Sequence, residues 1–416
     1  MRRDESVLYD EAGSGAVIGT LYLAVTLAAA CVALAVHPLL TYPLSLILFG
    51  RPRPLAPPRA ADGPRPSLAI CMCAYREQDV IAAKIERLIE IAGEYGPATI
   101  HVYVDAPTDE TARIAEQYVD RIDLVVGAER AGKTYGMNQL VARSESELLL
   151  FTDANVESDG DVAIELSRAL ADPTVGCATA QLIYSNSRES PTSRLGSIYW
   201  TLEEWIKRIE SERIGLVGCD GAMFLMRRAL HVPPPPHLID DLFLSLHILV
   251  AGSRIVSVDH VRVFERSATG SDEEKRRKQR IACQAVNVHR AMWPQLRRMP
   301  ALSLYAYLSH RPLKWLMPFS VAGAIALAFV ALGLVAGAMV AAGALLVFAL
   351  LLFIGEKAQI KPFSLLSSGL LSLVGVGTGV LESIFLGKTY TVWDPAASVR
   401  LEPFRATDRV NKPASK

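Results

Sequence analysis

Three long stretches of this chain are almost free of charged residues. Residues 16–50 and 316–355 contain no Lys, Arg, Asp or Glu, and residues 362–387 contain only Glu382. About 20 apolar residues in a row suffice for a helix to cross a bilayer. The first stretch predicts one span and a remainder broken by prolines, the second a hairpin of two helices, and the third one span or a re-entrant pair. The first stretch is too long for a cleaved signal peptide, so we expect a multi-pass integral membrane protein.

Basic residues beside these stretches predict the orientation of the chain. Eight precede the second stretch: Lys275, Arg276, Arg277, Lys278, Arg280, Arg290, Arg297 and Arg298. Because Lys and Arg next to membrane helices favour the cytoplasmic side, we expect the soluble part in the cytoplasm. Six more basic residues in 388–416 favour the same side. One span before the soluble part and three after it would instead put this tail on the opposite side, so the number of spans stays open. The formal net charge is zero, so no overall field favours nucleic acid.

Residues 68–152 alternate between short apolar runs and amphipathic helices. Such an order predicts a parallel sheet with helices on both faces. Strands are expected at 68–73, 99–104, 122–126 and 148–152, with helices at 79–92, 108–118 (Thr108 as N-cap) and 134–142. Downstream we expect strands at 175–181, 222–226 and 254–258, and helices at 194–213, 242–250 and 275–298. The last of these is a basic helix of the kind that suits a membrane surface.

Two acidic residues follow directly after expected strands. Asp105 ends the second strand and Asp153 the fourth, and the carboxyl ends of parallel strands face one ligand crevice. A carboxylate there can hold a divalent metal, and the metal can hold a diphosphate. The six cysteines lack zinc-site spacing, so we expect them to be reduced.

One alternative is a nucleotide hydrolase. Residues 127–134 match the P-loop pattern G-x-x-x-x-G-K-[ST] and lie between an expected strand and an expected helix. The loop follows the third strand rather than the first, however, and this interpretation leaves Asp105 and the Asp240–Asp241 pair without roles. A membrane-associated P-loop NTPase therefore stays as the minority hypothesis.

A longer series of motifs explains more of the chain. In order these are CAYRE (73–77), VDAPTDET (104–111), GKTYGMN (132–138), FTDAN (151–155), GCDGA (218–222), DDL (240–242) and RRKQRI (276–281). Over roughly residues 66–290 the series resembles membrane-bound glycosyltransferase family 2, which includes relatives of cellulose and hyaluronan synthases and other inner-membrane polysaccharide or glycolipid glycosyltransferases. The resemblance implies an α/β, Rossmann-like GT-A fold flanked by transmembrane helices. It also implies inverting transfer from a nucleotide-diphosphate sugar, with a UDP-sugar favoured, to a polysaccharide or lipid-linked acceptor.

The resemblance assigns roles to residues at the matching positions. The nucleotide-sugar site would comprise Tyr75, Glu77, Asp105, Lys133, Asn138, Asp153, Arg277 and Arg280. Asp153 begins the metal motif, in which Asn155 replaces the usual second aspartate, so Mg²⁺ or Mn²⁺ would be held by these two residues. Asp241 would be the catalytic base, with Asp240 and Asp220 on the acceptor side. Ile281 replaces a tryptophan of processive relatives.

These assignments divide the chain into six parts. We expect an N-terminal transmembrane region (1–50), a proline-rich linker (51–66), a GT-A catalytic domain (67–265), basic interface helices (266–315), a C-terminal transmembrane region (316–387) and a basic tail (388–416). The departures at Val104, Asn155 and Ile281 leave a catalytically silent membrane partner as a third hypothesis.

Overall fold

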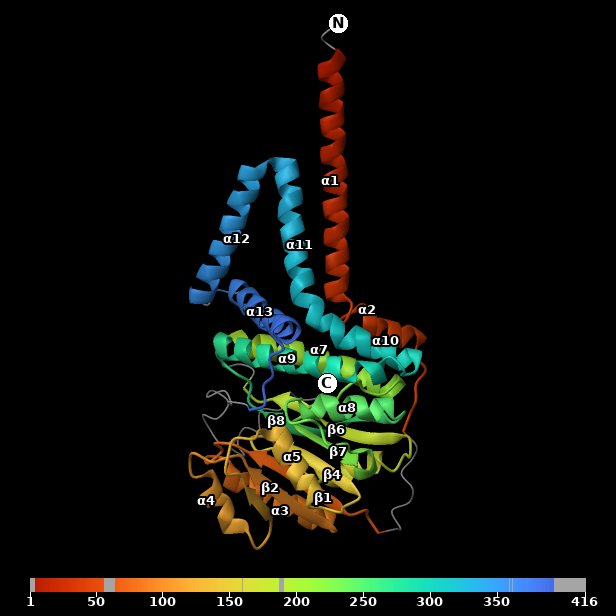
Figure 1. Ribbon diagram of the computed structural model, residues 1–416, viewed down its shortest axis with the longest axis vertical. Helices are drawn as coiled ribbons and strands as arrows, with labels where there is room; N and C mark the ends of the chain where they lie inside the picture. Colours follow the sequence, from red (N-terminus) through yellow and green to blue (C-terminus); the bar gives the residue numbers. More distant parts are fainter. Residues whose placement is uncertain are drawn as a thin grey trace, which may run out of the picture.

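The computed structural model describes residues 4–55, 64–158, 160–186, 191–358, 360 and 362–392, and the side chains of all of these except 4–14 and 191–193. An α/β domain forms the lower part of the molecule in Figure 1, and long helices rise from it. A layer of helices that includes α7 (Pro191–Arg213), α9 (Ser271–Leu296) and α10 (Ala301–His310) separates the two parts. The fold therefore has a soluble body, an intermediate helical layer and a projecting helical region.

One eight-stranded mixed sheet organises the α/β domain, in the order β3-β2-β1-β4-β7-β6-β8-β5. The first four strands in this order pair in parallel, as the sequence predicts. β7, however, runs antiparallel to both β4 and β6. The direction of β7 was not predicted, because a short buried strand leaves the same apolar run in either direction. The strands are β1 (Leu68–Ala74), β2 (Ala98–Val104), β3 (Asp123–Val126), β4 (Leu148–Asp153), β5 (Glu157–Ser158), β6 (Val175–Tyr184), β7 (Met223–Arg227) and β8 (Arg254–Glu265).

Strand β1 lies at the centre of two hydrophobic cores, and all seven of its residues are buried. Leu68, Ile70 and Met72 face the core formed with α3 (Ile81–Tyr95) and α6 (Val162–Ala169). The alternate residues Ala69, Cys71 and Cys73 face the core formed with α5 (Lys133–Ala142) and α8 (Asp240–Val250). Because strand side chains alternate between faces, helices cover both sides of the sheet.

Short helices were the main errors of the sequence prediction. The expected helix 108–118 is divided into α4 (Thr111–Ala115) and the 3₁₀ turn Glu116–Tyr118. Thr108 does not cap it; instead Asp109 Oδ1 accepts from the backbone N and Oγ1 of Thr111, at 3.1 and 2.6 Å. The sequence prediction also lacked α6 and α10 (Ala301–His310). Helices of so few turns carry too little periodicity to identify.

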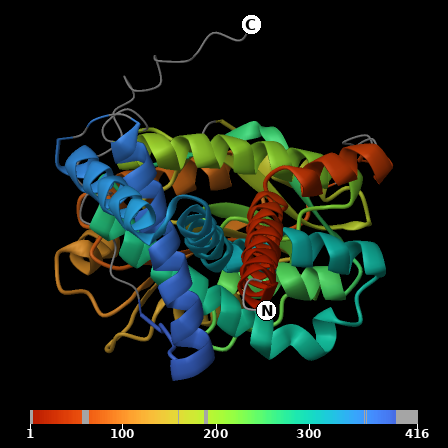
Figure 2. The same cartoon turned by 90° about the horizontal axis from the view of Figure 1, so that it is seen from above.

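In the part of the chain that the structure describes, four helices are long and apolar enough to cross a membrane: residues Gly15–Val36 of α1 (Asp4–Val36), α11 (Pro312–Ala336), α12 (Ala338–Ala358) and α13 (Phe363–Leu386). The predicted hairpin is confirmed, with Gly337 between α11 and α12 at φ 92°. The predicted proline-broken remainder contains the short α2 (Thr41–Phe49). α1 and α11 lie side by side (Figures 1 and 2).

α13 packs against the intermediate layer more extensively than the other three apolar helices do. Its main partner is α9 (Ser271–Leu296), and it also touches α7 (Pro191–Arg213). A Cβ on Gly379 would overlap the carbonyl oxygen of Gln279, and one on Gly375 would overlap that of Lys275, so only glycine permits this approach. The predicted re-entrant pair is wrong, since residues 363–386 form one helix.

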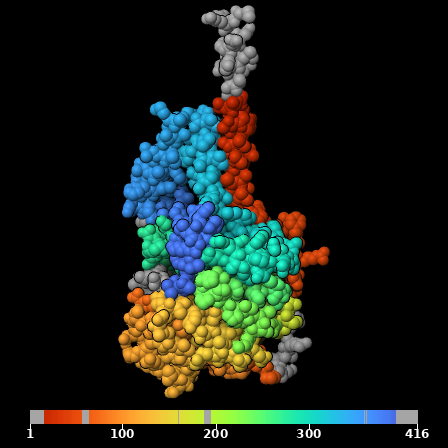
Figure 3. All heavy atoms as spheres, viewed as in Figure 1, coloured from red at the N-terminus to blue at the C-terminus, as the bar shows by residue number. Residues whose placement is uncertain are grey.

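The chain returns to the α/β domain after α13 (Figure 3). Asn287 Nδ2 donates to the Lys388 carbonyl at 2.8 Å, and Gln284 Nε2 donates to the Tyr390 carbonyl at 2.8 Å. The carbonyl of Thr391 lies against Gly132 at the start of α5. Residues 388–392 are therefore on the same side of the apolar helices as the α/β domain.

Candidate active site

The loops after β1, β2 and β4 meet at the carboxyl edge of the sheet. β1 lies between β2 and β4, and the crossovers leave these strands in opposite directions, which is where open α/β sheets bind ligands. Two residues in these loops, Arg76 and Ala106, have left-handed backbones at φ 55° and 46°. Non-glycine residues adopt this conformation at a cost of about 1–3 kcal/mol, and they concentrate at functional sites.

Asp105 organises one corner of this crevice. The residue is fully buried, and its carboxylate accepts from the backbone N–H groups of Ala131 and Gly132 at 2.8 and 3.1 Å. It also accepts from Arg130 Nε at 3.1 Å. The Arg130 guanidinium lies over the ring of Tyr75, 3.3 Å from its centroid. Tyr75 and Asp105 were predicted as site residues from the sequence. Arg130 was missed, although it lies only three residues before Lys133.

The same contacts argue against a P-loop. In a P-loop the backbone N–H groups of the glycine-rich loop cradle phosphates. Here the amides of Ala131 and Gly132 are committed to a carboxylate, which would repel an anion. The loop also follows β3, which is the edge strand of the sheet. The nucleotide-hydrolase alternative is not supported.

Lys133 forms the charged centre of the crevice. Its Nζ lies 2.7 Å from Asp153 Oδ1 and 3.9 Å from Asp240 Oδ2. Burial alone would lower the pKa of Lys133, but Asp153, Asp240 and Asp241 more than offset this effect and raise it above its ordinary value. The ammonium is thus permanently charged at neutral pH, beside the carboxylate predicted to hold a metal.

Asp241 lies in the first turn of α8 and belongs to the same charged centre. A Cβ on Gly221 would lie 2.8 Å from Asp241 Oδ2 and 3.4 Å from Lys133 Nζ, so the glycine gives both groups room to face the crevice. Burial and then the neighbouring Asp240 raise the pKa of Asp241 to about 7, against the opposing effect of Lys133. A carboxyl group with that pKa can accept a proton at neutral pH.

α5 holds in place the proline-rich segment that leads to Asp241. Thr134 Oγ1 donates to the Leu238 carbonyl at 2.8 Å, and Asn138 Nδ2 donates to the Pro234 carbonyl at 2.8 Å. The structure therefore places the Asn138 amide on the segment before the acidic pair. Glu77 is buried in the loop after β1, where its backbone N–H donates to Thr111 Oγ1 at 2.8 Å.

The two predicted arginines, Arg277 and Arg280, both lie on α9. Burial, and then Arg277, lower the pKa of Arg280, while Asp241 and Asp153 act in the opposite direction. Arg280 is thus within range of the charges of Asp241 and Asp153. Arg277 donates to the Tyr184 hydroxyl at 3.4 Å and lies 3.5 Å from Glu274.

The predicted acceptor-side residues lie in different environments. Asp220 pairs with Lys207 of α7, whose Nζ also lies 2.7 Å from Glu204 and 4.5 Å from the ring centroid of Trp200. Asp240, only 4% exposed, instead lies beside Lys133. The Asp240–Asp241 pair is therefore part of the charged centre, while Asp220 belongs to a cluster on α7.

Asp153 and Asn155 suit a hard divalent cation. Asn155 Nδ2 donates to Glu265 Oε1 at 3.3 Å, which leaves its carbonyl oxygen, the better ligand, for a metal. The described residues contain no group of three His, Cys, Asp or Glu side chains arranged around a metal. Mg²⁺ and similar ions often use one or two protein oxygens and take the rest from phosphates and water. Glu265 was missed because it ends a strand that the sequence predicted to stop at residue 258.

A family profile described as Glycosyl transferase family 2 matches residues 69–232. These residues form a family 2 glycosyltransferase domain. The match includes β1 to β4, the Gly132–Lys133 motif and the Asp153 turn, and it ends before Asp241.

Characterised relatives of this glycosyltransferase domain differ in the sugars that their names specify. An N-acetylglucosaminyltransferase of Azorhizobium caulinodans is 27% identical over 176 residues, which are 38% of this chain and 44% of the relative. A beta-monoglucosyldiacylglycerol synthase of a Nostoc species is 22% identical over 191 residues, 44% of this chain and 40% of that protein. The chain thus spans less than half the length of either relative.

A solved structure shows the fold of this chain. The mannosyltransferase PcManGT from Pyrobaculum calidifontis, in complex with GDP-Man and Mn²⁺, superposes with a TM-score of 0.65 at 20% identity. The superposition includes 87% of this chain and 99% of that one. The GT-A fold that the sequence resemblance implied is therefore confirmed.

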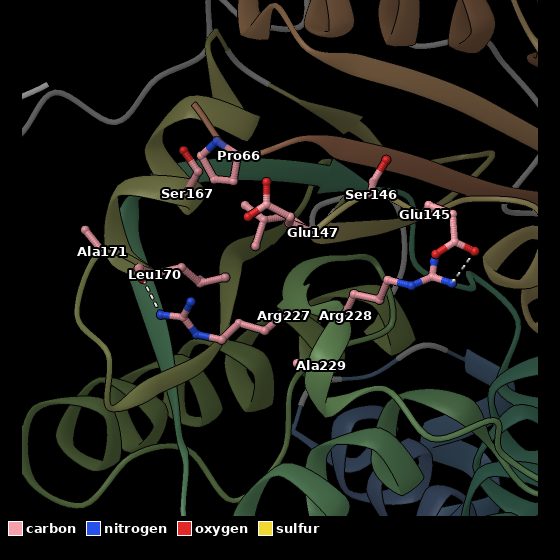
Figure 4. Close-up of a pocket in the computed structure, with 11 residues that line it drawn as sticks. Pro66, Glu145, Ser146, Glu147, Ser167, Leu170, Ala171, Arg227, Arg228 and Ala229 are labelled. Carbon is pink, nitrogen blue, oxygen red and sulfur yellow. Dashed lines mark hydrogen bonds and ion pairs between the residues drawn. The ribbon is translucent and has the colours of Figure 1, made fainter. Parts of the chain in front are cut away.

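A cavity of about 680 Å³ lies at the other end of the glycosyltransferase sheet (Figure 4). It is bounded by Pro66 before β1, Leu148 at the start of β4 and Arg227 at the end of β7. Asp153 is at the opposite end of β4, so this cavity is not the active site. The Arg227 guanidinium donates to the carbonyls of Leu170 and Asp172.

Proposed function

We propose that the protein is a membrane-bound glycosyltransferase that moves a sugar from a nucleoside-diphosphate sugar to a hydroxyl group of a saccharide or lipid-linked acceptor. Inversion at the anomeric carbon is part of the proposal. The observation that supports it best is that Asp153 and Asp241 both lie close to Lys133, with Arg280 within range of their charges. A base, a diphosphate-facing carboxylate and cations are the groups that such a transfer needs.

On the donor side, Tyr75 and the loop fixed by Asp105 would receive the nucleoside. Lys133 and Arg280 would stabilise the negative charge that develops on the departing diphosphate, because preorganised cations act strongly in a partly buried site. Arg280 has no hydrogen bond or ion pair within the described part of the chain, so its guanidinium is available for a bidentate contact to phosphate oxygens.

On the acceptor side, Asp241 would act as general base. The acceptor oxygen forms a bond to the anomeric carbon while the bond from that carbon to the diphosphate oxygen breaks, and Asp241 takes the hydroxyl proton. Attack from the face opposite the leaving group inverts the configuration. A positioned base of this kind contributes about 10²–10⁴-fold to the rate.

Asp153 and Asn155 would hold Mg²⁺ or Mn²⁺, which supplies positive charge to the donor diphosphate. In PcManGT the bound species are GDP-Man and Mn²⁺. The names of two relatives specify N-acetylglucosaminyl transfer and the synthesis of a glucosyldiacylglycerol. Together with the GDP-Man of PcManGT, these names support a sugar nucleotide as donor, and we favour a UDP-sugar.

The position of the intermediate helical layer favours an acceptor that reaches the site from the membrane. α9 carries Arg280 and also packs against α13. We propose that the membrane is a bacterial inner membrane, with the glycosyltransferase domain in the cytoplasm, in accord with the basic residues of α9.

A panel of radiolabelled nucleotide sugars tests the proposal. Purified full-length protein in detergent, with Mn²⁺ and a bacterial lipid extract, would be incubated with UDP-glucose, UDP-N-acetylglucosamine, UDP-galactose or GDP-mannose. We expect label from one donor to enter the lipid or polymer fraction, and no hydrolysis of ATP. ATP hydrolysis without sugar transfer would contradict the proposal.

A further inference from the structure

Lys84 is a buried cation that the proposed chemistry does not use. It lies on α3, under the turn that follows β4, and is 3% exposed. Burial lowers its pKa to about 8, although the carboxylates of Glu157 and Asp153 oppose this effect. A buried ammonium is costly unless the surroundings compensate for it, so its retention calls for a specific set of contacts.

Its hydrogen bonds join the two ends of the Asp153 turn. Lys84 Nζ donates to Thr152 Oγ1 at 3.0 Å and also to the Val156 carbonyl. Thr152 immediately precedes Asp153, and Val156 immediately follows Asn155. The two candidate metal ligands thus lie between two residues that are held by the same ammonium group.

The same hydrogen bonds continue toward the acceptor loop. Thr152 Oγ1 donates to the Ala222 carbonyl at 3.2 Å, and the Asp153 N–H donates to that carbonyl as well, at 3.2 Å. Ala222 directly follows Gly221, which faces Asp241 and Lys133. Lys84 therefore anchors the turn to α3 while Thr152 anchors it to the start of β7.

Lys207 is a buried lysine with carboxylate partners and serves as a comparison. It is equally buried, at 2% exposed, but it forms ion pairs with Glu204 and Asp220. Among the described residues Lys84 forms no such pair and donates instead to a hydroxyl and a backbone carbonyl. Its contacts fix the path of the chain.

We propose that Lys84 is a positioning residue whose ammonium group clamps residues 153–155 in the conformation that presents the Asp153 carboxylate and the Asn155 amide oxygen to a divalent metal. This inference rests on the proposed metal-dependent glycosyl transfer. Residues that orient metal ligands from behind typically change metal affinity by about 10–100-fold when they are replaced.

The test is Mn²⁺ binding by calorimetry to the full-length protein in detergent, with no nucleotide and no turnover. We expect Lys84→Met to weaken Mn²⁺ binding by about tenfold or more, because the turn loses both hydrogen bonds from the Lys84 ammonium group. UDP binding in EDTA should keep its wild-type affinity. Arg254→Met is the matched control, since Arg254 is also a buried cation that donates to backbone carbonyls, those of Arg53 and Ser211. It should lower thermal stability and leave Mn²⁺ affinity unchanged.

A second pair of variants covers the case in which Lys84→Met does not fold. Thr152→Val removes the oxygen that accepts from Lys84 and keeps the side-chain volume, whereas Thr152→Ser keeps that oxygen. Mn²⁺ should bind more weakly to the valine variant and normally to the serine variant. Equal Mn²⁺ affinity of the wild type, Lys84→Met and Thr152→Val would overturn the positioning role of Lys84 and leave the proposed function standing. A wild-type protein that binds no Mn²⁺ would overturn the metal part of the proposed function together with this inference.

Discussion

The active-site crevice and the helical layer above it both contain dense clusters of charge, yet the two clusters differ in how the charges are paired. In the crevice, Asp153 and Lys133 form an ion pair with side chains that are 33% and 22% exposed. In the layer, His310 of α10 lies 2.9 Å from Glu203 and 2.5 Å from Glu210, and all three side chains are at most 4% exposed.

The helical-layer cluster extends across four helices. Tyr42 of α2 donates to Glu210 at 2.6 Å, and Lys314 of α11 pairs with Glu203. α7 supplies both glutamates, so the short helices α2 and α10 and the long α11 are all tied to it. Every one of these partners comes from the protein itself.

This difference distinguishes a binding site from a structural joint. Charges that will meet a ligand must be incompletely compensated, as Arg280 is, and as the carboxylates that share the one ammonium of Lys133 are. Buried charges that stabilise an assembly must have partners, because an unpaired charge in a low-dielectric interior is strongly unfavourable. Substitutions in the crevice should therefore change catalysis, and substitutions in the layer should change stability.

The largest effect is expected at Asp241. Asp241→Asn should reduce glycosyl transfer by about 10²–10⁴-fold, since the amide cannot accept the acceptor proton. Donor affinity, measured by calorimetry with UDP-sugar and Mn²⁺, should stay within about threefold of wild type, and thermal stability should not fall. A variant that transferred sugar at the wild-type rate would remove Asp241 from the mechanism.

The reverse pattern is expected at Glu203. Glu203→Gln leaves buried His310 and Lys314 without their shared carboxylate, and breaking a buried charge pair costs about 3–5 kcal/mol of stability. Thermal unfolding in detergent measures this loss. Glu145→Gln is the control, because Glu145 is 94% exposed and lies 3.7 Å from Arg228. Equal unfolding temperatures for both variants would show that the layer's charges are not structural.

Gly379 tests the joint between α13 and α9. Gly379→Ala places a methyl group against the Gln279 carbonyl, and overpacking of this kind costs about 1–3 kcal/mol. Because α9 carries Arg280, we also expect a rise in the KM for the donor. Gly343→Ala in α12 has nothing within 4 Å of the new methyl and should leave both stability and KM unchanged. Identical behaviour of the two variants would contradict the close packing of α13.

The smallest effect is the dependence of activity on pH. The pKa of Asp241 is raised to about 7, so its basic form is lost as pH falls below that value. kcat/KM should level off above about pH 7 and fall about tenfold per unit below it. Because this pKa is higher than that of the unfolded chain, the folded state binds the extra proton, and this group's contribution to stability decreases as pH rises toward 7. Asp241→Asn should abolish that decrease, and its persistence would assign the titration to another group.

Much of the donor half could be predicted from sequence, for a physical reason. Parallel strands joined by short helices bring consecutive loops to one edge, so Asp105 and Asp153 had to approach each other once the alternation was recognised. Lys133 belongs to the same local pattern. The left-handed turns at Arg76 and Ala106 had no signal, because neither residue is of a type that favours that conformation.

The residues that were missed act across long separations in the chain. Lys84 contacts residues about 70 positions later, and Glu265 contacts Asn155 from 110 positions away. His310 meets glutamates about 100 positions before it. No local pattern encodes such pairs, since each partner alone has the appearance of an ordinary polar residue on a helix or at a strand end.

The sequence by itself determined that this chain has apolar helices on either side of an α/β domain and that the acidic motifs lie at strand ends, because hydrophobic period and strand order are local properties. Only the tertiary structure decided that β7 runs antiparallel, that α13 packs against α9, and that residues 388–392 return to the α/β domain. It also decided which charges are paired with each other and which face the crevice. Those outcomes depend on distances between segments far apart in the chain, which composition and periodicity do not specify.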